Sequence, residues 1–138
     1  MRIAVSACLL GDNCKYNGGN NYSEKVAGFI KGHEVIPVCP EVMGGLPTPR
    51  EPSEIVDGIV SHKDGKSVDK EFRKGAEIAL KKVKESGAEL VILQSRSPSC
   101  GVRSVYDGTF SGTIIPGQGI FAKLLADNNI KVLDVSEL

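Results

Sequence analysis

The chain has 138 residues, and its 17 acidic and 17 basic side chains give a formal net charge of zero at pH 7. This balance argues against the broad basic surface with which proteins bind polymeric nucleic acid, and the absence of Trp leaves few platforms for stacking bases. No apolar run approaches the roughly 20 residues of a membrane span. We therefore expect one cytoplasmic domain over residues 1–138, with no membrane contact and no obligate protein partner.

The first elements are predicted to alternate between strand and helix. Residues 2–6 are mostly apolar, with β-branched side chains, and favour a strand. Ser23 is a favourable N-cap for a helix over residues 24–31, which Gly32 ends. A second strand is expected over residues 34–38. This β-α-β order is typical of a parallel sheet.

A hairpin and a long helix are predicted next. Strands over residues 54–60 and 67–68 flank an Asp-Gly pair at 64–65, a dipeptide typical of hairpin turns. Asp69 is expected to cap a helix that continues to about residue 86, with apolar side chains at helical spacing.

The remaining elements complete the predicted fold. Residues 90–93 form an unbroken apolar run, as expected of a strand that is buried on both faces. An irregular β excursion is predicted over residues 102–115, a helix over 120–127 and a last strand over 131–135. We therefore predict a small, Rossmann-like α/β domain. Its mostly parallel sheet carries helices on its faces, together with a β-hairpin excursion.

Three of the four cysteines, Cys8, Cys39 and Cys100, each come just after a predicted strand of the sheet. Because α/β sheets build their sites at the carboxyl ends of their strands, we expect these thiols to converge. Converging thiolates in a cytoplasmic protein select zinc, copper(I) or an iron–sulfur cluster, although each cysteine alone is better explained as a small buried side chain. Cys14 lies in a polar loop without a preceding strand. Among a fourth ligand, a free thiol and an incidental side chain, we favour the last two.

Three further side chains are candidate catalytic residues. Glu41 follows Cys39 by two positions, and a carboxylate beside a metal site can act as a general acid or base; an exposed loop carboxylate or a cap explains it equally well. Ser97 and Ser99 precede Cys100, and either hydroxyl can relay a proton or hold a substrate oxygen. The commoner role of a serine in such a segment is to bond its own turn.

Two arginines are candidate substrate-binding residues. Arg50 and Arg96 come from different loops on the predicted site side of the sheet, where a guanidinium can bind a carboxylate or phosphate or offset the charge of a cluster. A surface ion pair is the commoner role of an arginine. His33 and His62 are distant in sequence from the cysteines, and we interpret both as non-catalytic.

Four segments together resemble the DUF523 family, which includes the bacterial 2-thiouracil desulfurases. They are SACLLGDNCKYNGG, CPEVMGGLPTPREPSEI, SRSPSCG and GQGIFAKLL, and the resemblance extends from Cys8 to about Leu125. It implies an α/β fold and an oxygen-sensitive [4Fe–4S] cluster. On the matching motifs, the cluster ligands are Cys8, Cys39 and Cys100.

The resemblance also implies a reaction. The open iron of the cluster takes the sulfur of a thiolated pyrimidine such as 2-thiouracil, and water attacks the carbon in a hydrolytic, non-redox step. Glu41 and a serine are the implied acid–base pair; we prefer Ser97 and leave Ser99 open. Two positions depart from the family pattern. Asn17 stands where an Asp is common, so it cannot handle a proton as that Asp would, and Gln94 stands where a Lys is common.

Other functions also agree with this pattern of cysteines. One is a non-catalytic protein that binds a metal or an iron–sulfur cluster for storage, delivery or sensing, and another is a thiol-based binding module without a metal. Substitution of Glu41 distinguishes an enzyme from a carrier, because only turnover depends on an acid–base group.

Overall fold

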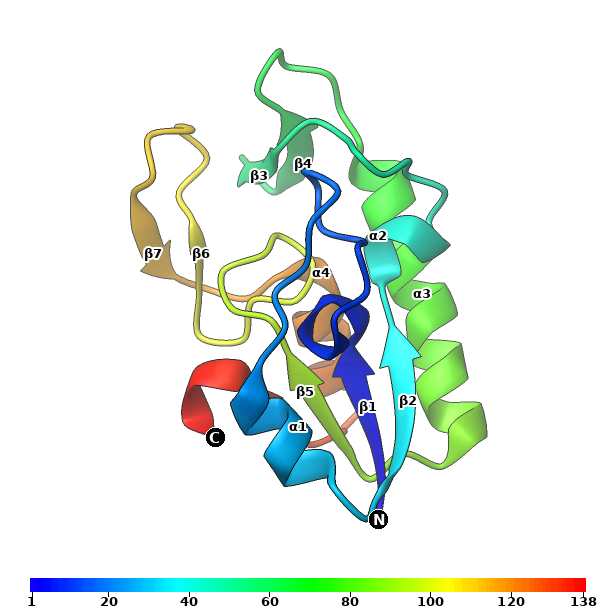
Figure 1. Cartoon of the computed structure of the whole chain (residues 1–138). Coiled ribbons are helices and arrows are strands. Elements are labelled where there is room, and N and C mark those ends of the chain that lie inside the picture. Colours follow the sequence, from blue (N-terminus) through cyan, green and yellow to red (C-terminus); the bar gives the residue numbers. More distant parts are fainter.

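A parallel sheet of four strands forms the centre of the computed structural model, which describes all residues, 1–138 (Figure 1). Its strands are β1 (Arg2–Ser6), β2 (Glu34–Val38), β5 (Leu90–Leu93) and β8 (Val132–Asp134), in the spatial order β2-β1-β5-β8. All three strand pairs are parallel. The predicted α/β fold is confirmed.

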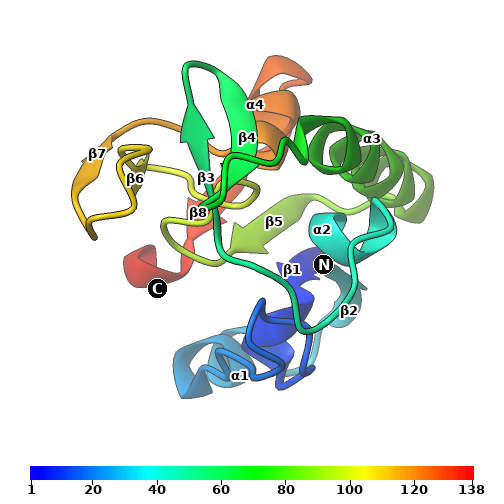
Figure 2. The ribbon, with the colours of Figure 1, turned by 90° about the horizontal axis from the view of Figure 1, so that it is seen from above.

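Helices cover both faces of this sheet (Figures 1 and 2). The longest helix, α3 (Asp69–Ser86), lies with α4 (Ile120–Asp127) on one face. On the other face lie α1 (Glu24–Ile30) and the short 3-10 helices η1 (Ala7–Leu10) and η2 (Val135–Glu137). The two layers of helices explain why the central strands are apolar on both sides.

Alternate residues of the strands divide between two cores. In β5, Leu90 and Ile92 pack with α1 and η1, whereas Val91 and Leu93 pack with α3 and α4. This division follows from the two-residue period of a strand. All four residues are buried, which confirms the interpretation of the LVIL run.

The start of α3 differs from the prediction. Val68 occupies the N-cap position and provides no side-chain cap, so the expectation that Asp69 caps the helix is wrong. Asp69 is the first helical residue. Its carboxylate accepts a hydrogen bond of 3.0 Å from the backbone N–H of Val60 and pairs with Arg73 one turn later at 2.6 Å. The predicted end of the helix before Gly87 is confirmed.

The predicted single strand over residues 54–60 is wrong. Two antiparallel strands, β3 (Ser53–Val56) and β4 (Ile59–His62), replace it. They are joined by Asp57 and Gly58, both of which have positive φ (51° and 80°). This is the backbone that a tight hairpin turn requires, and Asp-Gly is a favourable pair for it.

Two further β features lie beyond this hairpin. The predicted turn at residues 64–65 is present and returns Ser67 to an isolated bridge with Ser61. The predicted β excursion is also confirmed, as the hairpin of β6 (Ser104–Tyr106) and β7 (Ile114–Pro116). Both hairpins lie beyond the carboxyl ends of the central strands (Figure 1). No helix is both long and apolar enough to cross a lipid bilayer.

Candidate active site

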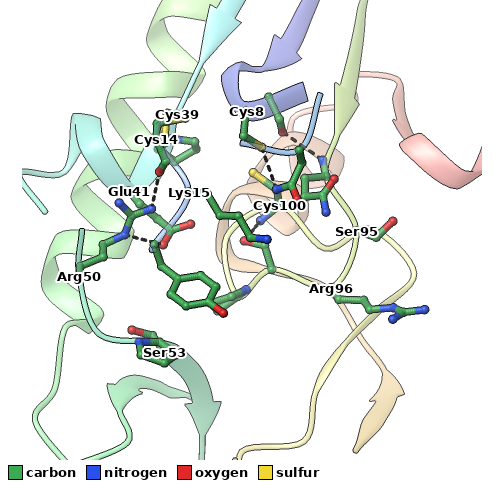
Figure 3. A pocket seen from close by; sticks show the side chains of 18 of the residues that line it. Cys8, Cys14, Lys15, Cys39, Glu41, Arg50, Ser53, Ser95, Arg96 and Cys100 are labelled. Atoms are coloured by element: carbon green, nitrogen blue, oxygen red, sulfur yellow. Dashed lines mark hydrogen bonds and ion pairs between the residues drawn. The ribbon is translucent and has the colours of Figure 1, made fainter. Parts of the chain in front are cut away.

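The segments that follow β1, β2 and β5 line one cavity of about 640 Å³. Cys8 lies in η1, Cys39 lies between β2 and the one-turn helix α2 (Pro40–Met43), and Cys100 lies in the loop after β5. All three thiols line the cavity, as their positions after the strands predict (Figure 3).

The topology of the sheet explains this convergence. The chain leaves β1 toward β2 on one side, and β5 then adds on the other side of β1. Neighbouring strands whose connections run in opposite directions leave a crevice at their carboxyl ends, which is where α/β proteins bind ligands. The cavity occupies this crevice, and the two hairpins contribute Ser53, Glu54, Tyr106 and Gly112 to its lining.

Close contact between glycines holds α2 against α3. A Cβ at Gly75 would lie 1.8 Å from the carbonyl oxygen of Pro40, and a Cβ at Gly44 would lie 2.0 Å from that of Glu71. No side chain fits at either position, so the backbones of the two helices touch. This contact positions Glu41, the second residue of α2.

The N-terminus of α4 holds the loop of Cys100. The backbone N–H groups of Gly119 and Ile120 each donate a hydrogen bond of 2.8 Å to this loop, to the carbonyl oxygens of Gly101 and Pro98. A Cβ at Gly119 would meet the backbone of Ser99 at 2.5 Å. The free amides of the helix start therefore stabilise the loop.

Cys14 is also in the cavity, beside Cys39. The Cys14 thiol donates a hydrogen bond to the sulfur of Cys39, which lowers the pKa of Cys39 to about 7 despite its burial. A hydrogen bond from the backbone N–H of Val42 acts in the same direction. The same contact raises the pKa of Cys14. The sequence did not predict this neighbour, because nothing in a polar loop indicates where it folds back.

The other two thiols are buried. Desolvation raises the pKa of Cys8, against a hydrogen bond of 3.5 Å from the side-chain amide of Asn21. Desolvation raises the pKa of Cys100 more strongly, although Ser6 contributes an opposing hydrogen bond. Buried thiols of this kind stay protonated unless positive charge replaces the proton, which is what metal binding does.

The donor set suits a cluster better than a single ion. No three side chains among His, Cys, Asp and Glu are placed to hold one metal ion. In a [4Fe–4S] cluster each thiolate binds a different iron, so the sulfur atoms stand farther apart than the ligands of one ion. Cys8, Cys39 and Cys100 reach one cavity from three different segments, so each can bind a different iron of such a cluster.

Glu41 and Arg50 form an ion pair at the cavity wall, with 3.3 Å between Oε1 and Nε. The Arg50 side chain is only 5% exposed. Its remaining donors bond to the carbonyl oxygens of Pro47 (3.2 Å) and Cys14 (2.9 Å) and to the hydroxyl of Thr48 (3.0 Å). Burial raises the pKa of Glu41, and the charge of Arg50 opposes the rise. These contacts make Arg50 a positioning residue, and substrate binding by it stays a prediction.

The two candidate serines have different surroundings. Ser97 lines the cavity, and its hydroxyl oxygen accepts hydrogen bonds from the backbone N–H groups of Ser99 (3.0 Å) and Cys100 (3.1 Å). Ser99 is fully buried, and its hydroxyl has no hydrogen-bond partner. It is not among the lining residues. Of the two serines, only Ser97 lines the cavity, and a catalytic role for either stays a prediction.

Arg96 lies at the edge of the cavity with a positive φ of 66°. Its side chain is exposed and points away from the cysteines (Figure 3). Its predicted contact with substrate would need another side-chain rotamer, so it too stays a prediction.

The two departures from the family pattern lie in different places. Gln94 lines the cavity, and its backbone N–H donates to the hydroxyl of Ser6 at 3.1 Å. Asn17 is exposed and outside the lining, where its side-chain oxygen accepts a hydrogen bond of 2.9 Å from Gly19.

The β3–β4 hairpin supplies residues that the sequence analysis did not select. The Ser53 hydroxyl, in the cavity, lies 2.9 Å from Nδ1 of His62. Glu54 is buried, and its carboxylate accepts hydrogen bonds from Gly108 (2.9 Å) and Phe110 (3.2 Å). These contacts depend on the turn at residues 57–58, which was not predicted.

Comparison with known proteins identifies the family. The 2-thiouracil desulfurase family matches residues 3–137. The chain belongs to this family. A relative, the uncharacterised protein YbbK of Bacillus subtilis, is 39% identical, with 99% of this chain and 97% of YbbK covered.

A solved structure shares the 2-thiouracil desulfurase fold. It is that of TudS, a [4Fe–4S]-dependent thiouracil desulfidase, which is 37% identical to this chain. The two superpose with a TM-score of 0.92 over 99% of this chain and 92% of TudS. The resemblance inferred from the motifs is therefore confirmed at the level of both family and fold.

Proposed function

We propose that this protein binds a [4Fe–4S] cluster through Cys8, Cys39 and Cys100 and uses it to hydrolyse a thiolated pyrimidine such as 2-thiouracil. The supporting observation is the meeting of these three strand-end thiols in one cavity of a 2-thiouracil desulfurase family member. When bound, a cluster with three protein ligands supplies one open, thiophilic iron as a Lewis acid for sulfur. The net reaction replaces a C=S bond with C=O, consumes water and releases hydrogen sulfide.

Glu41 is the proposed general base. Its Oε1 is bonded to Arg50, which leaves Oε2 to accept a proton from the attacking water. A carboxylate with a raised pKa holds that proton better than an exposed one, and proton transfer of this kind contributes roughly 10²- to 10⁴-fold to a rate. Arg50 keeps the carboxylate oriented toward the cavity.

Ser97 is the proposed proton donor. Both lone pairs of its hydroxyl oxygen are used by backbone N–H groups. The O–H is therefore its one free hydrogen-bonding group, and it is available to a ring nitrogen or to the departing sulfur. The buried Ser99 has no comparable access.

The test is anaerobic reconstitution with iron and sulfide, followed by incubation with 2-thiouracil. We expect cluster absorption together with uracil and sulfide in equal amounts. Failure to take up a cluster would contradict the whole proposal, and a loaded protein that forms no uracil would contradict this substrate.

Glu41→Gln tests the role of the base and separates an enzyme from a cluster carrier. Turnover should fall at least about 100-fold because the water loses its proton acceptor. The cluster absorption should stay unchanged, because Glu41 is not a proposed ligand. Unchanged turnover would exclude Glu41 as the base.

A further inference from the structure

A hydroxyl and an imidazole are paired in the wall of the cavity. Ser53 on β3 and His62 on β4 are cross-strand partners, and the Ser53 oxygen lies 2.9 Å from Nδ1 of His62. His62 is only 9% exposed and does not reach the cavity, whereas Ser53 lines it. In Figure 3, Ser53 lies beyond Glu41 and Arg50 from the cysteines.

The imidazole limits the orientation of the hydroxyl. A serine hydroxyl has one donor and two acceptor sites and rotates freely when unpartnered. The contact with His62 is the only hydrogen bond that this hydroxyl makes within the protein. If Nδ1 carries a proton it donates to Ser53, whose O–H is then free to donate. If Nδ1 is bare it accepts from Ser53, whose oxygen is then free to accept. In both cases an oriented polar atom is available to a ligand in the cavity.

We propose that Ser53, oriented by His62, is a specificity-determining residue that binds the C4 oxo group of the pyrimidine. The inference rests on the proposed function, which directs the thiocarbonyl toward the cysteines. A ring held in that way presents its second exocyclic atom to a wall away from the thiols. Ser53 is the side chain there with an oriented and partly unused hydroxyl.

The test compares two substrates in the anaerobically loaded protein. 2-Thiouracil carries the C4 oxo group, and pyrimidine-2-thione lacks it. Ser53→Ala should raise KM for 2-thiouracil by about 3- to 10-fold, the range for one neutral hydrogen bond, with kcat nearly unchanged. KM for pyrimidine-2-thione should not change. Ser53→Thr, which keeps the hydroxyl, should restore the wild-type KM.

Matched variants test the part played by His62. Ser61→Ala removes a hydroxyl next to His62 that bonds the backbone outside the cavity, and it should leave KM unchanged. His62→Leu should reproduce the KM effect of Ser53→Ala, and the double variant should be no worse, because both changes remove one interaction. If His62→Leu does not fold, His62→Asn replaces it in this test, because the asparagine keeps a polar atom near the position of Nδ1.

A second measurement does not depend on turnover. The chain has two histidines, so nitrogen NMR of the imidazoles gives one signal set for His62 and one for the exposed His33 as an internal control. Uracil should shift the His62 signals in the wild type but not in Ser53→Ala.

The outcomes distinguish this inference from the proposed function. A wild type that releases uracil, with an unchanged KM in Ser53→Ala, would overturn the role of Ser53 alone. Equal KM changes for both substrates would overturn recognition of the oxo group. If the wild type forms no uracil, the proposed function fails. The shift of the His62 nitrogen signals on addition of uracil then shows whether the pyrimidine ring contacts the Ser53 hydroxyl.

Discussion

At the scale of single residues, the Glu41–Arg50 ion pair sets the pH at which the proposed base is available. A base acts only when deprotonated, so kcat/KM should fall as the pH falls through the pKa of Glu41. Because burial raises that pKa from 4.5, the acidic limb of the profile should lie above the ordinary range of a glutamate. Arg50→Gln removes the opposing charge and should move this limb to still higher pH.

Arg103 provides the control for this pH profile. It is an exposed arginine that pairs with Glu137 at 2.9 Å, away from the cavity. Arg103→Gln should leave the acidic limb in place. If Arg50→Gln folds and its limb does not move, another group is the base.

Because the Cys14–Cys39 contact lowers the pKa of Cys39, we expect Cys39 of the cluster-free protein to be more reactive than an ordinary thiol. Iodoacetamide reacts with thiolates, so alkylation of Cys39 should reach half its maximal rate near pH 7 rather than near the ordinary value of 9.0. Cys14→Ala removes the donor and should move this midpoint upward, whereas Cys14→Ser keeps a donor and should move it less. Peptide mass spectrometry would identify the alkylated residue, and an unmoved midpoint in Cys14→Ala would contradict the contact.

At the scale of elements, the packing of α2 on α3 positions Glu41. Gly75→Ala would place a methyl group against the carbonyl of Pro40, and we expect a loss of about 1–3 kcal/mol in the free energy of unfolding, together with lower turnover. Gly28→Ala is the control, because a Cβ at this position in α1 meets nothing within 4 Å. It should stabilise the protein by about 0.5–1 kcal/mol. Denaturant unfolding measures both, and equal stability of the two variants would contradict the contact.

At the scale of the whole molecule, the sheet topology joins three distant segments into one site. Serine at Cys8, Cys39 or Cys100 should each lower the iron and sulfide retained after anaerobic reconstitution, because a cluster held by three ligands loses one of them. Cys14→Ser should retain wild-type amounts, although it also lines the cavity. If Cys14→Ser loses as much iron as the serine variants at Cys8, Cys39 and Cys100, then Cys14 is also a cluster ligand.

Local patterns were sufficient for the central sheet but not for the β3–β4 hairpin. The sequence contains three Asp-Gly pairs, at residues 57–58, 64–65 and 107–108. Only the pair at 57–58 lies inside a predicted strand, the one over residues 54–60, and the structure makes it the turn between β3 and β4. Propensity cannot distinguish a turn from a strand where an apolar pattern continues across the pair, and this error concealed the pairing of Ser53 with His62.

The sequence alone determined the four strands of the central sheet, the strand-end positions of Cys8, Cys39 and Cys100, and the family. Hydrophobic periodicity and specific motifs are local properties that can be read along a chain. Three other features of the site were decided only by the tertiary structure. They are the contact between Cys14 and Cys39, the exclusion of Ser99 from the cavity and the ion pair of Arg50 with Glu41. Each depends on how loops distant along the chain pack against one another, and on which way a side chain then points. No short-range pattern of residue types encodes the packing of distant loops or the direction in which a side chain points.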